Sequence, residues 1–318
     1  MNGEFNNILN NPIALISPTT GPINFNLQAH TGLIPSAITA TSGSAGQVLT
    51  VVGGATVFSN SAAAVGSRVN GLRAVVSSQT GTFSGNQYLV QTTNAGQSFL
   101  LVSTAGFAVS VGTAGPAAGG RDIAGVFAST EVHWYMITTG ANSTTVAGIV
   151  STATPPNGPV LPVGYSAWAY LGGSAYSSSS TTVASDHAFR GNKSFYNVAF
   201  PVLTNGTATV ETAVSVSTAV PANALSFGLT GTATPVGAGG NIDLQLLIRT
   251  VTGNSVYAPR VGIYGGLGGV NQVISWALGP VVNTSSQQFL YLHTLTTGTI
   301  GNGSTLQIPY YEMPNGDA

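Results

Sequence analysis

Apolar and polar residues alternate with a period of two along several stretches of the chain. The clearest stretch is 242–249, where every second residue is apolar and Asp243 and Gln245 lie between them. A weaker alternation over 210–217 places three valines on one face, at Val210, Val214 and Val216. A period of two matches the alternating faces of a β-strand, so both stretches are predicted to be half-buried strands.

Turn-forming residues separate these runs. Asn205-Gly206 favours a type I′ hairpin turn, because both residues tolerate a positive φ angle. The glycine-rich segment 262–269 lacks the following helix and the Lys-Ser/Thr pair of a phosphate-binding loop, so we expect a flexible loop between strands. Many short strands joined by such turns predict an all-β fold of antiparallel strands in sandwich or jelly-roll-like domains.

Four segments are expected along the chain. Residues 1–40 are rich in Asn and Pro and are expected to form an extended N-terminal docking arm. Residues 41–90 are expected to form a connecting or shaft region, and 91–185 a β domain that ends near the polar run 176–182. Residues 186–318 are expected to form a C-terminal β-sandwich domain.

Charge is scarce. Only 5% of the 318 residues are charged and the net charge is −1, whereas an ordinary soluble domain has roughly 25% charged residues. A weakly charged surface favours association between chains. The cations are spread along the sequence, so no basic cluster and no nucleic-acid partner are expected. They are Arg68, Arg73, Arg121, Arg190, Lys193, Arg249 and Arg260.

Membrane insertion and disulfide bonds are not expected either. The charge-free run 74–120 is interrupted by polar residues every few positions, which is unlike a transmembrane helix. The chain has no cysteine, so burial and backbone hydrogen bonds must stabilise the fold. The sequence predicts no cofactor.

Two short motifs follow one another along the chain. The first is Ser42-Gly-Ser-Ala-Gly-Gln-Val-Leu-Thr50, which has the pattern "GxxGQVL". The second comprises Trp134-Tyr135, then Pro159-Val-Leu-Pro-Val-Gly-Tyr165, which has the pattern "WY…P.LP.GY". In this order they resemble segments of bacteriophage tail-fibre, collar-fibre and head-fibre proteins, and the resemblance covers about residues 42–230. It departs from the family pattern at 165–172, which lacks the charged residues usual there.

This resemblance implies a virion structural protein, a homotrimer that forms a fibre-like component of the tail or its collar and takes part in host attachment. It implies assembly in the bacterial host cytoplasm, contact with other virion proteins through the N-terminal arm, and a host surface glycan or receptor as a further partner. An alternative on the same virion is a capsid decoration or head-fibre protein that stabilises the shell.

Four aromatic residues stand out against the background of small residues: Trp134, Tyr135, Trp168 and Tyr170. Aromatic residues supply the largest buried area per side chain, which favours a position in the core or at a subunit interface. Their rings would also suit stacking against sugars in a binding platform. Parity places Trp168 and Tyr170 on the same face of one strand.

The sequence predicts no catalytic and no metal site. Asp122 and Glu131 are the best-placed acids for glycoside hydrolysis, but an ion pair with Arg121 is the simpler expectation. A polysaccharide depolymerase would need more acids than this chain has. Ser185-Asp186-His187 contains the residue types of a catalytic triad, yet neighbours on a strand point to opposite faces. The histidines lie far apart in the sequence, at His30, His133, His187 and His293.

Overall fold

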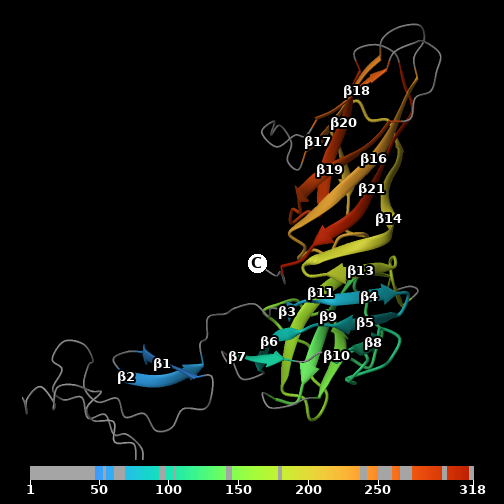
Figure 1. Ribbon diagram of the computed structural model, residues 1–318. Helices are drawn as coiled ribbons and strands as arrows, with labels where there is room; N and C mark the ends of the chain where they lie inside the picture. The colour runs from blue at the N-terminus through green and yellow to red at the C-terminus, as the bar shows by residue number, and fades with distance from the viewer. Residues whose placement is uncertain are drawn as a thin grey trace, which may run out of the picture. The chain divides into compact units, whose positions relative to one another are not determined.

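The computed structural model describes two units of antiparallel strands, one within residues 1–63 and one within 64–318 (Figure 1). The described residues are 47–52, 55–60, 69–92, 98–102, 105–140, 145–177, 181–236, 242–249, 260–265, 274–295 and 299–314. They contain no helix, and hence none that could span a membrane. The predicted all-β, antiparallel fold is confirmed, while the expected N-terminal arm, 1–40, lies outside the described residues.

The first unit contains a hairpin. Strand β1 (Gln47–Val52) pairs antiparallel with β2 (Ala55–Asn60) in a continuous register from Gln47 opposite Asn60 to Val52 opposite Ala55. The Gln-Val-Leu part of the first motif is therefore the start of a strand.

The second unit contains three antiparallel sheets. The seven-stranded sheet has the order β10-β9-β11-β6-β3, with β12 added on β11 and β7 on β6. Its strands are β3 (Val69–Asn70), β6 (Gln87–Thr92), β7 (Ser98–Val102), β9 (Glu131–Thr138), β10 (Val146–Ser151), β11 (Ala167–Ser177) and β12 (Thr182–Val183).

The eight-stranded sheet has the order β19-β16-β21-β14-β13-β4-β5-β8. Its strands are β4 (Arg73–Ser77), β5 (Thr80–Ser84), β8 (Phe107–Ser110), β13 (His187–Arg190), β14 (Lys193–Gly206), β16 (Ser226–Val236), β19 (Ile274–Val282) and β21 (Thr299–Glu312). The four-stranded sheet has the order β15-β20-β17-β18. It consists of β15 (Thr212–Ser215), β17 (Ile242–Arg249), β18 (Arg260–Gly265) and β20 (Gln288–Leu295).

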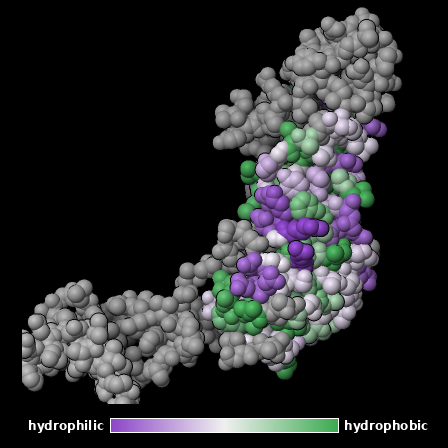
Figure 2. All heavy atoms as spheres, viewed as in Figure 1, coloured by the Kyte–Doolittle hydropathy of each residue, from purple (hydrophilic) through white to green (hydrophobic). Residues whose placement is uncertain are grey.

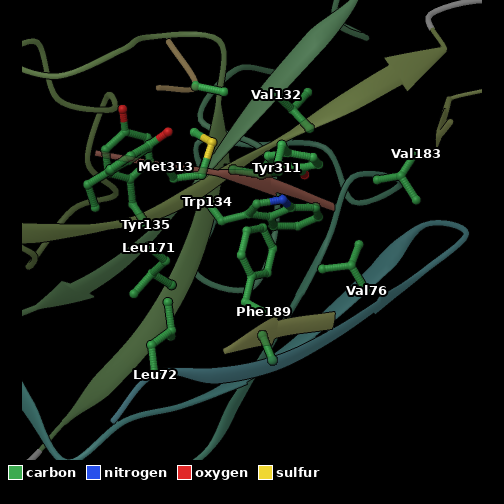
Figure 3. Packing of buried hydrophobic residues seen from close by; sticks show 14 of the residues in the cluster. Leu72, Val76, Val132, Trp134, Tyr135, Leu171, Val183, Phe189, Tyr311 and Met313 are labelled. Carbon is green, nitrogen blue, oxygen red and sulfur yellow. The ribbon is translucent and has the colours of Figure 1, made fainter. Parts of the chain in front are cut away.

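The eight-stranded sheet packs against both of the other sheets. On β5, Phe83 meets Trp134 of β9 with ring centroids 5.4 Å apart. Figure 3 shows the indole of Trp134 within the buried cluster, with Phe189 and Tyr311 around it. At the other end of the sheet, Phe227 of β16 lies 6.2 Å from Phe289 of β20. Apolar burial between sheets is therefore the main source of stability in this cysteine-free chain.

Burial patterns separate two kinds of strand. β4 and β5 alternate between exposed and buried residues, which is the half-buried pattern of a sheet with one solvated face. β9 and β11 are buried along almost their whole length, so both of their faces are covered. Their sequences fit this position, because Glu131 is the one acidic or basic side chain in either strand apart from His133.

The strand predictions are correct for 242–249 and only partly correct for 210–217. β17 has the predicted bounds. β15 covers only Thr212–Ser215, and although Val214 and Val216 are buried, Val210 is 71% exposed. The predicted burial is therefore correct for Val214 and Val216 and wrong for Val210, because the chain joins the sheet only at Thr212.

Two turn predictions were wrong. Gly206 is paired with Ser304 at the end of β14, so Asn205-Gly206 does not connect a hairpin, although Asn205 does have a positive φ of 54°. Residues 262–265 lie in β18 and not in a loop, and 266–269 lie outside the described residues. In both places strand pairing decided the conformation: Gly206 pairs with Ser304, and β18 pairs with β17.

The described sheets also cross the expected domain boundaries. β4 pairs with β13, which joins the segment 41–90 to the segment 186–318 within one sheet. The division into compact units falls at 63/64, and the expected divisions were 40/41, 90/91 and 185/186.

β10 and β7 are two edge strands of the seven-stranded sheet, and they differ in whether another segment covers their outer backbone edge. The outer edge of β10 is covered by the chain at 119–122, where Gly119 N donates to Gly148 O (2.7 Å) and Val150 N donates to Gly120 O (3.0 Å). No described strand pairs with the outer edge of β7, which carries exposed Leu100 and Val102. An apolar, uncharged edge strand is a site where another strand can add.

Gly148 provides a test of the contact between β10 and β8. A Cβ atom at this position would lie 2.0 Å from Val109 Cγ2 and 2.8 Å from Phe107 Cδ2. We expect Gly148→Ala to lower the unfolding free energy by about 1–3 kcal/mol through overpacking. Urea denaturation measures this loss. Gly125→Ala is the matched control, because a Cβ there meets nothing within 4 Å. Equal stability of the two variants would contradict the packing of β10 on β8.

Candidate functional site

The four candidate aromatic residues lie in the core. Their exposed fractions are 0% for Trp134, 0% for Tyr135, 5% for Trp168 and 2% for Tyr170. Trp134 faces the eight-stranded sheet, whereas Tyr135 lies on the other face of β9 and contacts Trp168 (5.4 Å) and Tyr170 (5.3 Å). A ring without an exposed face cannot stack against a sugar, so in this conformation these residues offer no binding platform.

The proline- and glycine-rich segment 153–165 covers Tyr135 and Trp168, which lie on the face of β9 and β11 opposite Trp134. The Tyr135 hydroxyl donates to Ala153 O. A Cβ at Gly158 would lie 2.2 Å from Trp168 Nε1, so the indole occupies the space that a larger residue would need. Val160 N donates to Asp122 Oδ2 at 3.3 Å, which fixes the segment to the preceding loop. The "P.LP.GY" motif thus packs over an aromatic cluster.

The expected ion pair of Arg121 with Asp122 or Glu131 is absent. Among the described residues the ion pairs are His133–Glu131 (3.7 Å) and Lys193–Glu312 (3.0 Å). Asp122 instead accepts from Ser151 Oγ at 2.5 Å, and the Arg121 guanidinium donates to Val111 O (2.9 Å) and Ala124 O (3.1 Å). Backbone carbonyls thus accept from the two terminal nitrogens of this buried cation, while its Nε has no hydrogen-bond partner among the described residues.

The Ser185-Asp186-His187 segment forms no triad, as expected from strand parity. Asp186 points outward and accepts from Ser77 Oγ (2.9 Å) and Ser78 N (3.0 Å). His187 points inward, where Nε2 lies 2.7 Å from Ser174 Oγ and Nδ1 lies 2.8 Å from Ser185 O. A carbonyl oxygen only accepts, so Nδ1 carries the proton and Ser174 donates to Nε2.

The Ser174–His187 contact has the spacing of a nucleophile and its base, but it is closed to substrates. Ser174 is 0% and His187 1% exposed, and Trp134 Nε1 also donates to Ser174 Oγ at 2.7 Å. Burial lowers the pKa of His187 from 6.5 to about 4, so the ring is neutral near pH 7. These contacts satisfy buried polar groups between two sheets.

The other described histidines are also held by hydrogen bonds within the chain. His133 Nδ1 lies 3.1 Å from the Tyr170 hydroxyl, and His293 Nε2 lies 2.8 Å from Ser304 Oγ. His30 lies outside the described residues. Within the described part of the chain no three His, Asp or Glu side chains gather as a metal site would require.

Arg73, which is distant in sequence, is a neighbour of Arg190 and Lys193 on the eight-stranded sheet, so these three cations are not scattered as expected. In the strand register Arg73 of β4 lies opposite Arg190 of β13, and Arg190 lies opposite Lys193 of β14. The row continues to Ser84 on one side and Glu312 on the other. In the view of Figure 2, strongly hydrophilic residues lie around the level of β13 and β14.

The cations of this row differ in their partners. Lys193 Nζ lies 3.0 Å from Glu312 Oε1. Through this contact Glu312 raises the pKa of Lys193, and Lys193 lowers the pKa of Glu312. Arg73 and Arg190 are both exposed. Neither of their guanidinium groups has an ion pair or hydrogen bond among the described residues. Two like charges therefore stand opposite each other without a compensating acid.

A second outward-facing row runs beside the cations. Two residues further along each strand, Thr82, Val75, Ala188, Phe195 and Tyr310 are successive cross-strand neighbours. Val75 is 58% and Phe195 39% exposed, and the rings of Phe195 and Tyr310 lie 5.7 Å apart. The row offers an apolar surface that is accessible to solvent.

The parts of the two rows on β4, β5 and β13 line a hollow of about 370 Å³. Its lining comes from these three strands and from Gly106 just before β8, and comprises Arg73, Ala74, Val75, Thr82, Phe83, Ser84, Gly106, Ala188, Phe189 and Arg190. The volume lies within the range of small-ligand sites, roughly 300–1,000 Å³. Unpaired guanidinium groups, hydroxyl groups and an apolar floor therefore meet in one accessible place, which is the candidate functional site.

Sequence reasoning missed this site, although part of it could have been predicted. Arg190 and Lys193 flank Gly191-Asn192, a two-residue turn between alternating segments, and such a turn places its flanking residues opposite each other. Arg73 joins them only through long-range pairing of β4 with β13.

Comparisons with known proteins add little to this picture. No protein-family model matches the sequence, and no curated protein matches it. Among solved structures, the chain is similar to the insecticidal delta-endotoxin Cry8Ea1 from Bacillus thuringiensis at 10% identity, with a TM-score of 0.18. The match covers 84% of this chain and 58% of that one. A TM-score this low carries no argument about fold or function.

Proposed function

We propose that the chain is a non-enzymatic structural protein of a bacteriophage virion, a trimeric fibre-like component of the tail or its collar that takes part in host attachment. The observation that supports this proposal most is the burial of the aromatic residues in the "WY…P.LP.GY" module. Its aromatic residues and the segment 153–165 pack into a helix-free β unit and leave no open catalytic cleft there. Stable, charge-poor β units of this kind suit a protein that assembles.

The positions of the chemically active groups support a non-enzymatic role. Ser174 and His187 are buried, and the Asp122 carboxylate is held by Ser151 and Val160 N. Glu131 accepts from Ala222 N at 2.7 Å. Burial raises the pKa of Glu131, but the nearby His133, 3.7 Å away, and the hydrogen bond from Ala222 N outweigh this effect and hold the pKa below 4.5. An ionised, hydrogen-bonded carboxylate is a poor general acid near pH 7.

Trimer formation gives the first test. Size-exclusion chromatography with light scattering of the purified chain is expected to give three times the chain mass of 31.9 kDa. The open edge of β7 supports association, so replacing Leu100 and Val102 by lysine should weaken the assembly. Val163→Lys is the control, because Val163 is 104% exposed on a loop. A monomeric wild-type chain at micromolar concentration would contradict the proposed trimer.

A further inference from the structure

We propose that the hollow on the eight-stranded sheet binds an anionic saccharide. Arg73 and Arg190 would hold its carboxylate, sulfate or phosphate group, and the row from Val75 to Phe195 would contact the apolar face of the sugar rings. This inference names the ligand class for the proposed host-attachment role, and it rests on that role.

The arrangement of charges favours the binding of an anion. Directly opposed like charges on neighbouring strands are destabilising, and Arg73 lies opposite Arg190. Glu312 is already paired with Lys193 and accepts from Ser226 Oγ at 2.8 Å. Asp186 precedes β13 and lies four residues from Arg190, about 13 Å along the extended chain. An oxyanion between the two guanidinium groups would relieve the repulsion and accept bidentate hydrogen bonds.

The uncharged residues of the hollow favour the binding of a saccharide over that of a small inorganic anion. Val75 and Ala188 form an apolar floor beside the hydroxyl groups of Thr82 and Ser84. The exposed ring of Phe195 continues this floor outward, and an aromatic face attracts the weakly positive C–H groups of a pyranose. A nucleic-acid backbone would need a longer track of cations, and Lys193 is already paired.

Calorimetric titration of the purified full-length chain tests the proposal with four probes of defined charge. They are an oligogalacturonate, its neutral methyl ester, a sulfated oligosaccharide of the same length, and inorganic sulfate. We expect at least one of the charged oligosaccharides to bind at least tenfold more tightly than the ester and than inorganic sulfate. Which of the two binds more tightly then identifies the preferred oxyanion.

Substitutions locate the binding site. Arg73→Gln and Arg190→Gln should each weaken binding about tenfold or more, because each removes a charge-assisted hydrogen-bonding pair. Arg73→Lys should have a smaller effect, since it keeps the charge and loses the planar fork. Ala188→Leu should weaken binding by filling the hollow. Arg249→Gln, which removes the same charge from β17 of the four-stranded sheet, should leave affinity unchanged.

Stability measurements separate lost binding from misfolding. Removing one of two opposed cations should leave the melting temperature unchanged or slightly raised. Three results would overturn the inference: binding of neither charged oligosaccharide, equal affinity for the ester or for inorganic sulfate, or equal affinity of the wild type, Arg73→Gln and Arg190→Gln. None of them bears on whether the protein is part of a virion, which imaging of the particle tests separately.

Discussion

Replacement of Trp134 by alanine is expected to lower the unfolding free energy by about 3–5 kcal/mol. Trp134 is fully buried between two sheets, where its ring packs against Phe83 and its Nε1 donates to Ser174 Oγ. The substitution leaves a cavity and removes a donor from a buried hydroxyl group. Chemical denaturation monitored by circular dichroism measures the change.

Two further variants divide this effect into its parts. Trp134→Phe keeps much of the apolar volume and loses the indole N–H, so we expect a smaller loss of about 1–3 kcal/mol. Phe195→Ala removes a ring that is 39% exposed and should change stability by less than about 1 kcal/mol. If Trp134→Ala cost no more than Phe195→Ala, Trp134 could not lie between the sheets.

Acid is expected to destabilise the protein between pH 6.5 and pH 4 through His187. Burial lowers the pKa of this histidine in the folded state to about 4, from the ordinary value of 6.5. The unfolded chain therefore binds the proton first as the pH falls, so the unfolding free energy decreases across this range and is unaffected by His187 above it. The difference between the two pKa values corresponds to a loss of about 3 kcal/mol.

The variant His187→Gln separates this effect from other titrating groups. Below pH 4.5 the lowered pKa of Glu312, caused by Lys193 and Ser226, also makes acid destabilising, and His293 acts in the same direction as His187. Denaturation curves at pH 7.5, 6, 5 and 4.5 should show a steeper loss for the wild type than for His187→Gln. Parallel losses in the two proteins would show that His187 is not buried in its neutral form.

The accuracy of the sequence predictions depended on how far apart the interacting residues are in the chain. Periodicity located β17 because its alternation is local. It could not decide between the core and a binding platform for Tyr135 and Trp168, because β9 and β11 are covered on both faces. Over Tyr135 and Trp168 the cover comes from the segment 153–165, which has no periodic pattern of its own.

The candidate site shows the same limit. Arg190 and Lys193 are brought together by a two-residue turn, and the sequence contains the signal for it. Arg73 comes from β4, which pairs locally with β5, and no local feature indicates that its other neighbour is β13. A low overall charge likewise gives no sign that the few cations present will be neighbours on one sheet.

Location on the particle tests the central proposal most directly. Cryo-electron microscopy of phage particles that carry this protein, with antibody labelling of the chain, is expected to place threefold-symmetric density at the tail or its collar. Labelling at the symmetry axes of the capsid would contradict that placement and favour the decoration protein. Absence of the chain from purified particles would contradict a virion role altogether.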